Sequence, residues 1–117
     1  MTEISVEGLR EMRTRGDKLL LLDVRQPWEH ELARIADDVL IPLNELPARL
    51  DELDALDDPA GRTAIDGAPL VVCYCHHGLR SLDAAAFLER NGVARVASLA
   101  GGIDAWSRLI DPGVPRY

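Results

Sequence analysis

The sequence predicts an α/β fold in which a central, mostly parallel sheet is flanked by helices. Short apolar runs that suit buried strands alternate along the chain with segments that suit helices, an alternation typical of parallel sheets. The runs Leu19–Arg25 and Leu70–Cys75 are apolar until they end in charged or reactive residues, as buried parallel strands often are. We interpret residues 1–117 as a single domain, long enough to enclose a hydrophobic core.

The N-terminal part is expected to supply a capped helix before the first of these strands and a short helical turn after it. Ser5 is a suitable N-cap for a helix with apolar residues at helical spacing, and Gly16 is suited to end it. After the strand, Pro27 opens a loop or a short helix that continues to Leu32.

The middle of the chain is expected to hold a short strand and another helix. The strand Val39–Pro42 is stopped by its own proline. Asn44 is a suitable cap for the following helix, and the apolar face of that helix would consist of Leu46, Leu50 and Leu53. Residues 54–69, rich in Asp, Gly, Ala and Pro, are interpreted as a surface connection within the domain.

The C-terminal part is expected to repeat the alternation of strand and helix. A helix is predicted over Leu82–Asn91, ended by Gly92, and a strand over Arg95–Leu99. A last helix is predicted over Ile103–Leu109, followed by an irregular tail over Asp111–Tyr117.

Composition and charge limit the partners and the location that we expect. The formal net charge is −7, which repels nucleic acids and anionic membranes. No apolar run approaches the roughly 18 residues of a membrane span, and the segment Met1–Ile4 lacks the features of a signal peptide. We therefore expect a cytoplasmic location, with no nucleic-acid and no membrane partner. An anionic substrate would need a local positive site.

The two cysteines of the chain, Cys73 and Cys75, lie two residues apart on one predicted strand. That spacing is too constrained for a structural disulfide, and the chain has no second cysteine pair to complete a zinc site. Free cysteines are usually buried, inert small hydrophobes. We expect Cys73 to be one of these and not a resolving thiol.

Cys75 differs because it stands where a strand gives way to a loop and then to a helix. Free N–H groups and the positive end of the helix dipole favour an anion there. Gly78 allows the backbone to turn several amides inward, and Arg80 can bring a guanidinium to a bound oxyanion. Ser81 can bond to the helix start or to the loop. The residues alone indicate a nucleophilic cysteine in an anion cradle, with an inert core cysteine as the alternative.

Four segments resemble the signatures of single-domain rhodaneses, a family of sulfurtransferases. The loop Cys75–Ser81 resembles the active-site loop of that family. Leu22–Arg25 followed by Glu29 resembles its first signature, Ile41–Leu46 the segment after it, and Gly101–Trp106 its C-terminal signature. The four segments occur in the family's order and span nearly the whole chain, so together they are far more specific than any one alone.

This resemblance implies a rhodanese-like fold and a sulfurtransferase reaction in two covalent steps. Cys75 would take sulfane sulfur from a small donor such as thiosulfate as a persulfide, and would pass it to cyanide, a thiol or a sulfur-accepting protein. Backbone N–H groups would hold the sulfur, and the substrate-binding residues would be His76, His77, Gly78, Leu79, Arg80 and Ser81. Neither a metal nor an organic cofactor is required.

The resemblance also implies a supporting role for Asp23 and Arg25, which are predicted at the sheet edge where α/β proteins bind ligands. Asp23 could orient the loop through hydrogen bonds or could simply pair with Arg25, and the sequence leaves both open. The stretch Ala33–Asp38 departs from the Gly-His-Ile-x-Gly-Ala element of many family members, so the turn there is not set by the resemblance.

Two other functions are alternatives. Related cell-cycle phosphatases have one more residue in the loop, whereas only four residues separate Cys75 from Arg80 here, which makes a tighter cradle suited to a sulfur atom. The second alternative is a non-catalytic rhodanese-like binding or regulatory module. Inactive members typically lack the cysteine that this chain retains as Cys75.

Several other side chains have both a structural and a functional interpretation. His76 and His77 could form a metal site or supply a general base, but we expect them to face solvent and shape the entrance, where a partial positive charge could draw anions. Trp28 could line the pocket or pack in the core. Trp106 is expected in the core, and His30 is expected to be structural or exposed.

Overall fold

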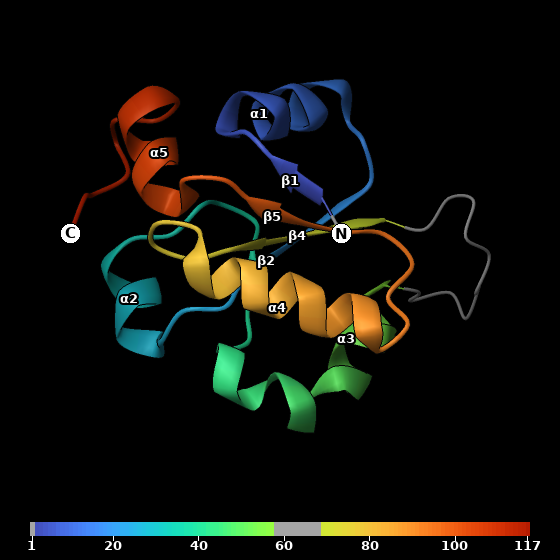
Figure 1. The fold of residues 1–117 in the computed structure, drawn as a ribbon. Helices are drawn as coiled ribbons and strands as arrows, with labels where there is room; N and C mark the ends of the chain where they lie inside the picture. Colours follow the sequence, from blue (N-terminus) through green and yellow to red (C-terminus); the bar gives the residue numbers. More distant parts are fainter. Residues whose placement is uncertain (1, 58–68) are drawn as a thin grey trace.

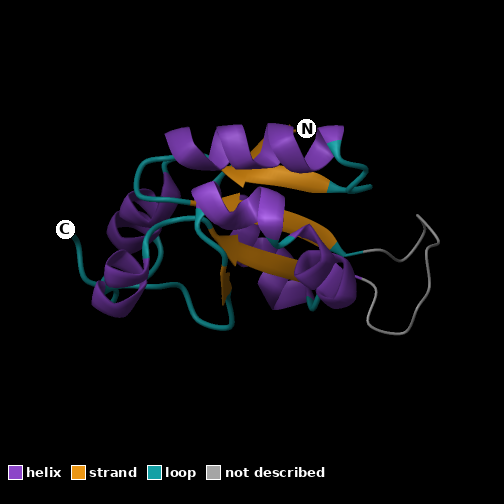
Figure 2. Cartoon of the chain, turned by 90° about the horizontal axis from the view of Figure 1, so that it is seen from below, coloured by secondary structure: helices purple, strands orange, loops and turns teal. Residues whose placement is uncertain are grey.

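The computed structural model describes residues 2–57 and 69–117 and contains a five-stranded parallel sheet between two layers of helices (Figures 1 and 2). The strands, which lie in the order β1-β5-β4-β2-β3, are β1 (Thr2–Ile4), β2 (Leu19–Asp23), β3 (Val39–Leu40), β4 (Leu70–Tyr74) and β5 (Val96–Leu99). The helices are α1 (Val6–Arg15), α2 (Pro27–Leu32), α3 (Leu50–Asp57), α4 (Leu79–Arg90) and α5 (Gly102–Leu109), with a 3-10 helix η1 (Leu43–Ala48). The predicted α/β fold is confirmed.

The two faces of the sheet carry separate hydrophobic cores because successive strand residues point to opposite sides. β2 pairs with β4 in a register that places Leu21 opposite Val72 and Leu22 opposite Cys73. Leu21 and Val72 pack with α1 and α5 on one face, whereas Leu22 and Cys73 pack with α4 and the η1–α3 segment on the other. Figure 1 shows α1 and α5 on one side of the sheet and α3 and α4 on the other.

The predicted ends of α1 are confirmed in atomic detail. The Ser5 side chain accepts a hydrogen bond of 3.0 Å from the Gly8 N–H, which satisfies one of the amides left free at the helix start. At the other end Gly16 adopts φ 74°, the left-handed conformation that closes many helices and that glycine tolerates best.

The prediction of a single helix starting at Asn44 is wrong, because the segment forms a 3-10 helix followed by an α-helix. The 3-10 helix η1 begins after Pro42 and contains Asn44, and α3 begins at Leu50. Pro47 lies inside η1 and has no N–H to donate, so it prevents one uninterrupted α-helix. The connection predicted over 54–69 starts later than expected, since α3 continues to Asp57, and residues 58–68 lie outside the described part of the chain.

Two helix starts and one strand also differ from the sequence-based prediction. α4 begins at Leu79, three residues before the predicted Leu82, because Gly78 at φ 104° turns the chain into the helix directly after the Cys75 loop. α5 likewise begins one residue early, at Gly102. The edge strand β1 was not predicted, since three residues carry too little periodicity.

The carboxyl ends of β2 and β4 meet at one edge of the sheet, where the Val24 N–H donates to the Tyr74 carbonyl at 3.1 Å. Arg25 and Cys75 therefore follow neighbouring strands. The starts of α4 and α5 lie at this edge, together with α2 (Figure 1). Among residues 2–57 and 69–117, no helix is both long and apolar enough to cross a membrane.

Candidate active site

Cys75 lies between the end of β4 and the loop that leads into α4. Its Sγ accepts hydrogen bonds from the Gly78 N–H at 3.1 Å and the Ser81 N–H at 3.4 Å, and it lies 3.6 Å from the Ser81 Oγ. Cys75 is only 1% exposed. Two loop amides thus point at the sulfur from the start of a twelve-residue helix, an arrangement that stabilises negative charge on a sulfur held there.

The start of α5 holds the other side of this loop. The N–H groups of Ile103 and Asp104 donate to the carbonyls of Cys75 and His76 at 2.9 and 3.1 Å. Gly102 permits this approach, because it adopts φ 59° and a Cβ at that position would overlap the Cys75 carbonyl oxygen. The carbonyls of Cys75 and His76 are therefore bonded by α5, which fixes the backbone on either side of the thiol. The Gly101–Trp106 resemblance marked this segment, but the sequence did not reveal its contact with the loop.

Ser81 is wholly buried and fixes the base of the cradle. Its Oγ shares a hydrogen bond of 2.7 Å with the Oγ of Ser98 on β5, and its backbone N–H points at Cys75. Ser98 was not identified from the sequence, because a serine inside a short strand has no distinctive pattern. The pair ties the first turn of α4 to the neighbouring strand.

Arg80 points to α2, where Glu29 receives it through two parallel hydrogen bonds of 2.7 and 2.9 Å. The sequence predicted a guanidinium free to meet an oxyanion, whereas the structure pairs it with a buried carboxylate. Arg80 holds the pKa of Glu29 well below its usual range, at about 2, and the Tyr117 hydroxyl contributes in the same direction. The Arg80 side chain nevertheless remains 37% exposed, so it is not closed off from solvent.

Asp23 and Arg25 form a buried pair at the end of β2. The carboxylate of Asp23 accepts from the Arg25 Nε at 2.9 Å and from its terminal nitrogen at 2.8 Å, and both side chains are inaccessible to solvent. His30 completes the group, with its Nδ1 2.9 Å from the carboxylate of Asp23. The sequence left two roles open for Asp23, and the structure shows the pair with Arg25. His30, bonded to the same carboxylate, has a structural role as expected.

Tyr117 connects this buried pair to Arg80 through Glu29, a role that was not predicted from the sequence. The Tyr117 hydroxyl accepts from Arg25 at 2.8 Å and donates to Glu29 at 2.7 Å. Its ring stacks on His76, with centroids 3.9 Å apart and planes within 8°. A tail that was expected to be irregular, and is irregular in backbone, nevertheless supplies a side chain to the active-site edge.

The two loop histidines differ from each other. His77 is exposed as predicted, but His76 is wedged between the rings of His77 and Tyr117, so the expectation that both face solvent is wrong for His76. Burial and the neighbouring His77 lower the pKa of His76, which favours its neutral form. Its Nε2 is buried and makes no hydrogen bond. Stacking between two rings explains the position of His76 better than solvation does.

Comparison with known proteins decides the family. The model of the rhodanese-like domain matches residues 5–109. The chain belongs to the rhodanese-like domain family. A sulfurtransferase of Allochromatium vinosum is 35% identical over 108 residues, which cover 92% of this chain and 90% of that protein. An adenylyltransferase and sulfurtransferase of Zea mays is 33% identical over 97% of this chain, which spans only 23% of that longer protein.

Solved structures agree with the fold of this rhodanese-like domain. A rhodanese-related protein of Thermoplasma volcanium is similar with a TM-score of 0.72 at 28% identity, and the match covers 98% of this chain and 96% of that one. A human single-domain sulfurtransferase is similar with a TM-score of 0.75 at 23% identity, over 93% and 97% of the two chains. The likeness extends over nearly the full length of both neighbours.

Two clusters among the described residues have the residue types of a metal site, but their acids already hold other partners. His76, His77 and Asp104 place ligand atoms within 4.8 Å of one another, as do Asp23, His30 and Asp38. The carboxylate of Asp104 accepts from two arginines of the C-terminal segment, and Asp23 is paired with Arg25. These ion pairs would have to break before a cation could bind, so the geometry gives no support to a metal centre.

The remaining sequence-based interpretations concern packing. Cys73 is confirmed as a core residue, and its burial raises the pKa of its thiol to about 12, which makes it a poor resolving thiol. Trp106 is confirmed in the core. Of the two interpretations of Trp28, packing in the core is wrong. The Trp28 side chain is 60% exposed, and its ring lies edge-to-face with that of Tyr117, with 6.0 Å between the centroids.

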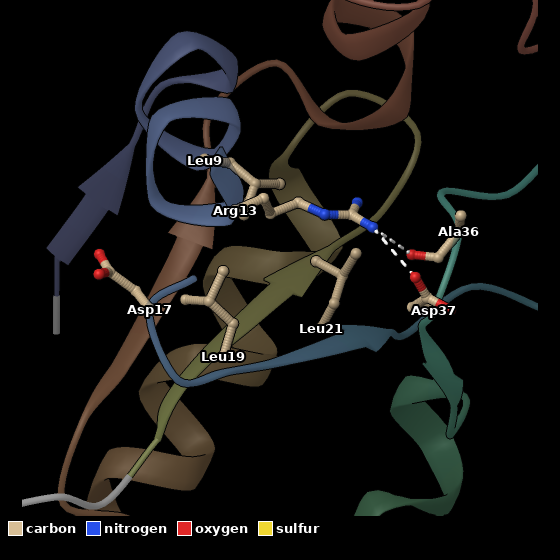
Figure 3. Close-up of a pocket in the computed structure, with 7 residues that line it drawn as sticks. All are labelled: Leu9, Arg13, Asp17, Leu19, Leu21, Ala36 and Asp37. Carbon is tan, nitrogen blue, oxygen red and sulfur yellow. Dashed lines mark hydrogen bonds and ion pairs between the residues drawn. The ribbon is translucent and has the colours of Figure 1, made fainter. Parts of the chain in front are cut away.

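A hollow of about 200 Å³ lies elsewhere in the rhodanese-like domain, between α1, β2 and the segment before β3 (Figure 3). It is lined by Leu9, Arg13, Asp17, Leu19, Leu21, Ala36 and Asp37. Arg13 crosses it to bond the Ala36 carbonyl at 2.9 Å and to pair with Asp37 at 3.6 Å. The lining holds no cysteine, and the hollow does not include the Cys75 loop.

Proposed function

We propose that this rhodanese-like protein moves sulfane sulfur from a thiosulfate-type donor to a thiophilic acceptor through a persulfide on Cys75. The observation that carries the proposal is the pair of N–H groups, from Gly78 and Ser81, that point at the Cys75 sulfur. Membership of the family supports sulfur transfer in general. The donor and the covalent intermediate are what the resemblance to rhodaneses implies, and the amides directed at Cys75 support them.

In the first step the thiolate of Cys75 attacks the outer sulfur of thiosulfate. A sulfur–sulfur bond forms on Cys75 while the sulfur–sulfur bond of thiosulfate breaks, and sulfite leaves with the electron pair. In the second step an acceptor such as cyanide attacks the outer sulfur of the persulfide. Thiocyanate then leaves and Cys75 returns as a thiolate, so the two half-reactions balance without a metal or an organic cofactor.

The loop residues divide the work of binding. The inward-facing amides of Gly78 and Ser81 would stabilise charge on the transferred sulfur as it develops. Arg80 would attract the oxygen atoms of the donor through its positive charge and through the N–H groups that do not bond Glu29. With only four residues between Cys75 and Arg80, these groups converge on a small volume.

The acceptor would approach over an apolar rim. Leu79, the first residue of α4, is 75% exposed, and Trp28 on α2 is also largely exposed. Both side chains are available to a partner that reaches the loop, although single exposed apolar residues are ordinary on protein surfaces. We include sulfur-accepting proteins, beside cyanide and small thiols, among the proposed acceptors because the resemblance to rhodaneses implies them.

Intact-mass spectrometry after exposure to thiosulfate tests the proposal. We expect a mass increase of one sulfur atom, which cyanide removes. The increase should be absent in Cys75→Ser and retained in Cys73→Ser, which is the matched control because both cysteines belong to the same strand and loop. A wild-type protein that gains no sulfur, yet still captures a protein partner when Cys75 is changed to serine, would instead be the non-catalytic binding module.

A further inference from the structure

We propose that Tyr117 is a positioning residue for the first half-reaction. Its hydroxyl would fix the Glu29–Arg80 pair in the orientation that receives the donor, and its ring would hold the beginning of the Cys75 loop. This inference rests on the proposed function, since it assigns a role in donor binding to Arg80. It concerns a residue that no signature in the sequence singled out.

The hydroxyl of Tyr117 links a buried arginine to the ion pair of a partly exposed one. It accepts from Arg25, which is wholly buried, and donates to Glu29, the carboxylate that holds the half-exposed Arg80. Arg25 cannot move, because its other N–H groups bond the Asp23 carboxylate and the Ala33 carbonyl. Through Tyr117, the immobile Arg25 holds the Glu29 carboxylate, and thereby Arg80, in place.

The effect is one of orientation and not of charge. The carboxylate of Glu29 accepts two hydrogen bonds from Arg80, one from Tyr117 and one from the Gln26 N–H. Arg80 is the largest contributor to its low pKa, so Glu29 stays ionised at neutral pH when the tyrosine hydroxyl is removed. The charges of the pair would be unchanged, but the carboxylate would lose one of the donors that fix its plane, and with it the plane of the guanidinium.

The ring of Tyr117 has a separate contact with the loop. It stacks flat on His76, the residue next to Cys75, and meets the edge of Trp28 on α2. The carbonyl of His76 is bound from the other side by the Asp104 N–H. The Tyr117 ring and the start of α5 therefore hold His76 from two sides. Removing the ring would loosen the backbone next to Cys75.

The variant Tyr117→Phe separates the two contacts, because it removes the hydroxyl and keeps the ring. Persulfide formation from thiosulfate and persulfide discharge to cyanide are measured as separate half-reactions by stopped-flow. We expect the apparent affinity for thiosulfate to fall about fivefold, which corresponds to about 1 kcal/mol. Discharge to cyanide should be unchanged, because the thiol, the amides and the charge of Arg80 all remain. Arg116→Ala is the control, since Arg116 is a neighbour whose ion pair is with Asp104.

The variant Tyr117→Leu removes the ring as well, and we expect it to slow both half-reactions. Equal slowing of both by Tyr117→Phe would show a purely structural role and overturn the inference, as would wild-type rates in both. If the wild-type protein itself forms no persulfide, the proposed function fails as well. An active wild type with an unaffected Tyr117→Phe variant overturns the role of Tyr117 alone.

Discussion

Cys73 and Cys75 show how strongly the surroundings of a residue decide its chemistry. Both are buried, and they lie two residues apart. Cys73 packs among aliphatic side chains, where burial raises the pKa of its thiol and makes it inert. Cys75 packs in the same cluster, but its sulfur also receives two backbone N–H groups at the start of α4. The sequence predicted this difference from the position of each cysteine relative to the strand end.

At the same scale, Arg80→Lys tests whether the shape of the guanidinium matters as well as its charge. Lysine keeps the positive charge but cannot donate two parallel hydrogen bonds to one carboxylate or one oxyanion. We expect kcat/KM with thiosulfate to fall about tenfold, the effect of losing one or two charge-assisted hydrogen bonds.

Thermal unfolding is the companion measurement for Arg80→Lys. The lysine can still neutralise Glu29, so the melting temperature should change little. A variant that loses stability and activity to the same extent would contradict a role for Arg80 in donor binding.

At the scale of elements, the junction between the Cys75 loop and α5 is the part that a single substitution disturbs most directly. Gly102→Ala would place a Cβ against the carbonyls of Cys75 and His76. We expect a loss of at least tenfold in sulfur transfer, measured with thiosulfate and cyanide, because the loop carbonyls must shift and the inward-facing amides shift with them.

Gly92→Ala is the matched control for that substitution. Gly92 also has a positive φ, of 89°, but nothing lies within 4 Å of the Cβ that alanine would add. This variant should lose about 1 kcal/mol of stability from backbone strain alone and keep its activity. If Gly92→Ala impairs transfer as much as Gly102→Ala, backbone strain, and not contact with the loop, explains both results.

The elements also show what could be predicted from the sequence and what could not. The cap at Ser5, the end at Gly16 and the strand before Cys75 follow from local rules and are confirmed. The 3-10 helix around Pro47 was missed, because the apolar spacing of the leucines suggested one helix and outweighed the proline. The roles of Tyr117 and Ser98 could not be predicted, because both depend on contacts between segments far apart in the chain.

At the scale of the whole molecule, the parallel sheet gives the site its rigidity. Independent cores pack against the two faces of the sheet, and β2 and β4 deliver Arg25 and Cys75 to the same edge. A chain of hydrogen bonds then runs from Asp23 through Arg25, Tyr117 and Glu29 to Arg80. The charged groups of this edge are therefore linked to the core, so protonating them at low pH should lower the stability of the fold as well as disturb the site.

Stability should fall as the solution is acidified from pH 4.5 towards 2. The pKa of Glu29 drops from 4.5 to about 2 on folding, so its contribution is fully present above pH 4.5 and is lost as pH falls towards 2. The lowered pKa of His76 adds a separate loss that begins as pH falls below 6.5, because the folded state prefers the neutral ring. Urea unfolding at a series of pH values measures the effect.

Glu29→Gln should flatten this part of the pH profile, because glutamine does not titrate. Glu31→Gln is the control, as Glu31 is exposed on the same short helix and should leave the profile unchanged. A Glu29→Gln profile as steep as that of the wild type would show that other groups carry the acid sensitivity.

The most direct test of the account is a crystal structure of the protein after treatment with thiosulfate. We predict one additional sulfur atom bonded to the Sγ of Cys75, with the amides of the Gly78–Ser81 segment directed at it. An unmodified Cys75 in protein treated under these conditions, or a sulfur adduct on a different residue, would contradict the assignment of the chemistry to this loop.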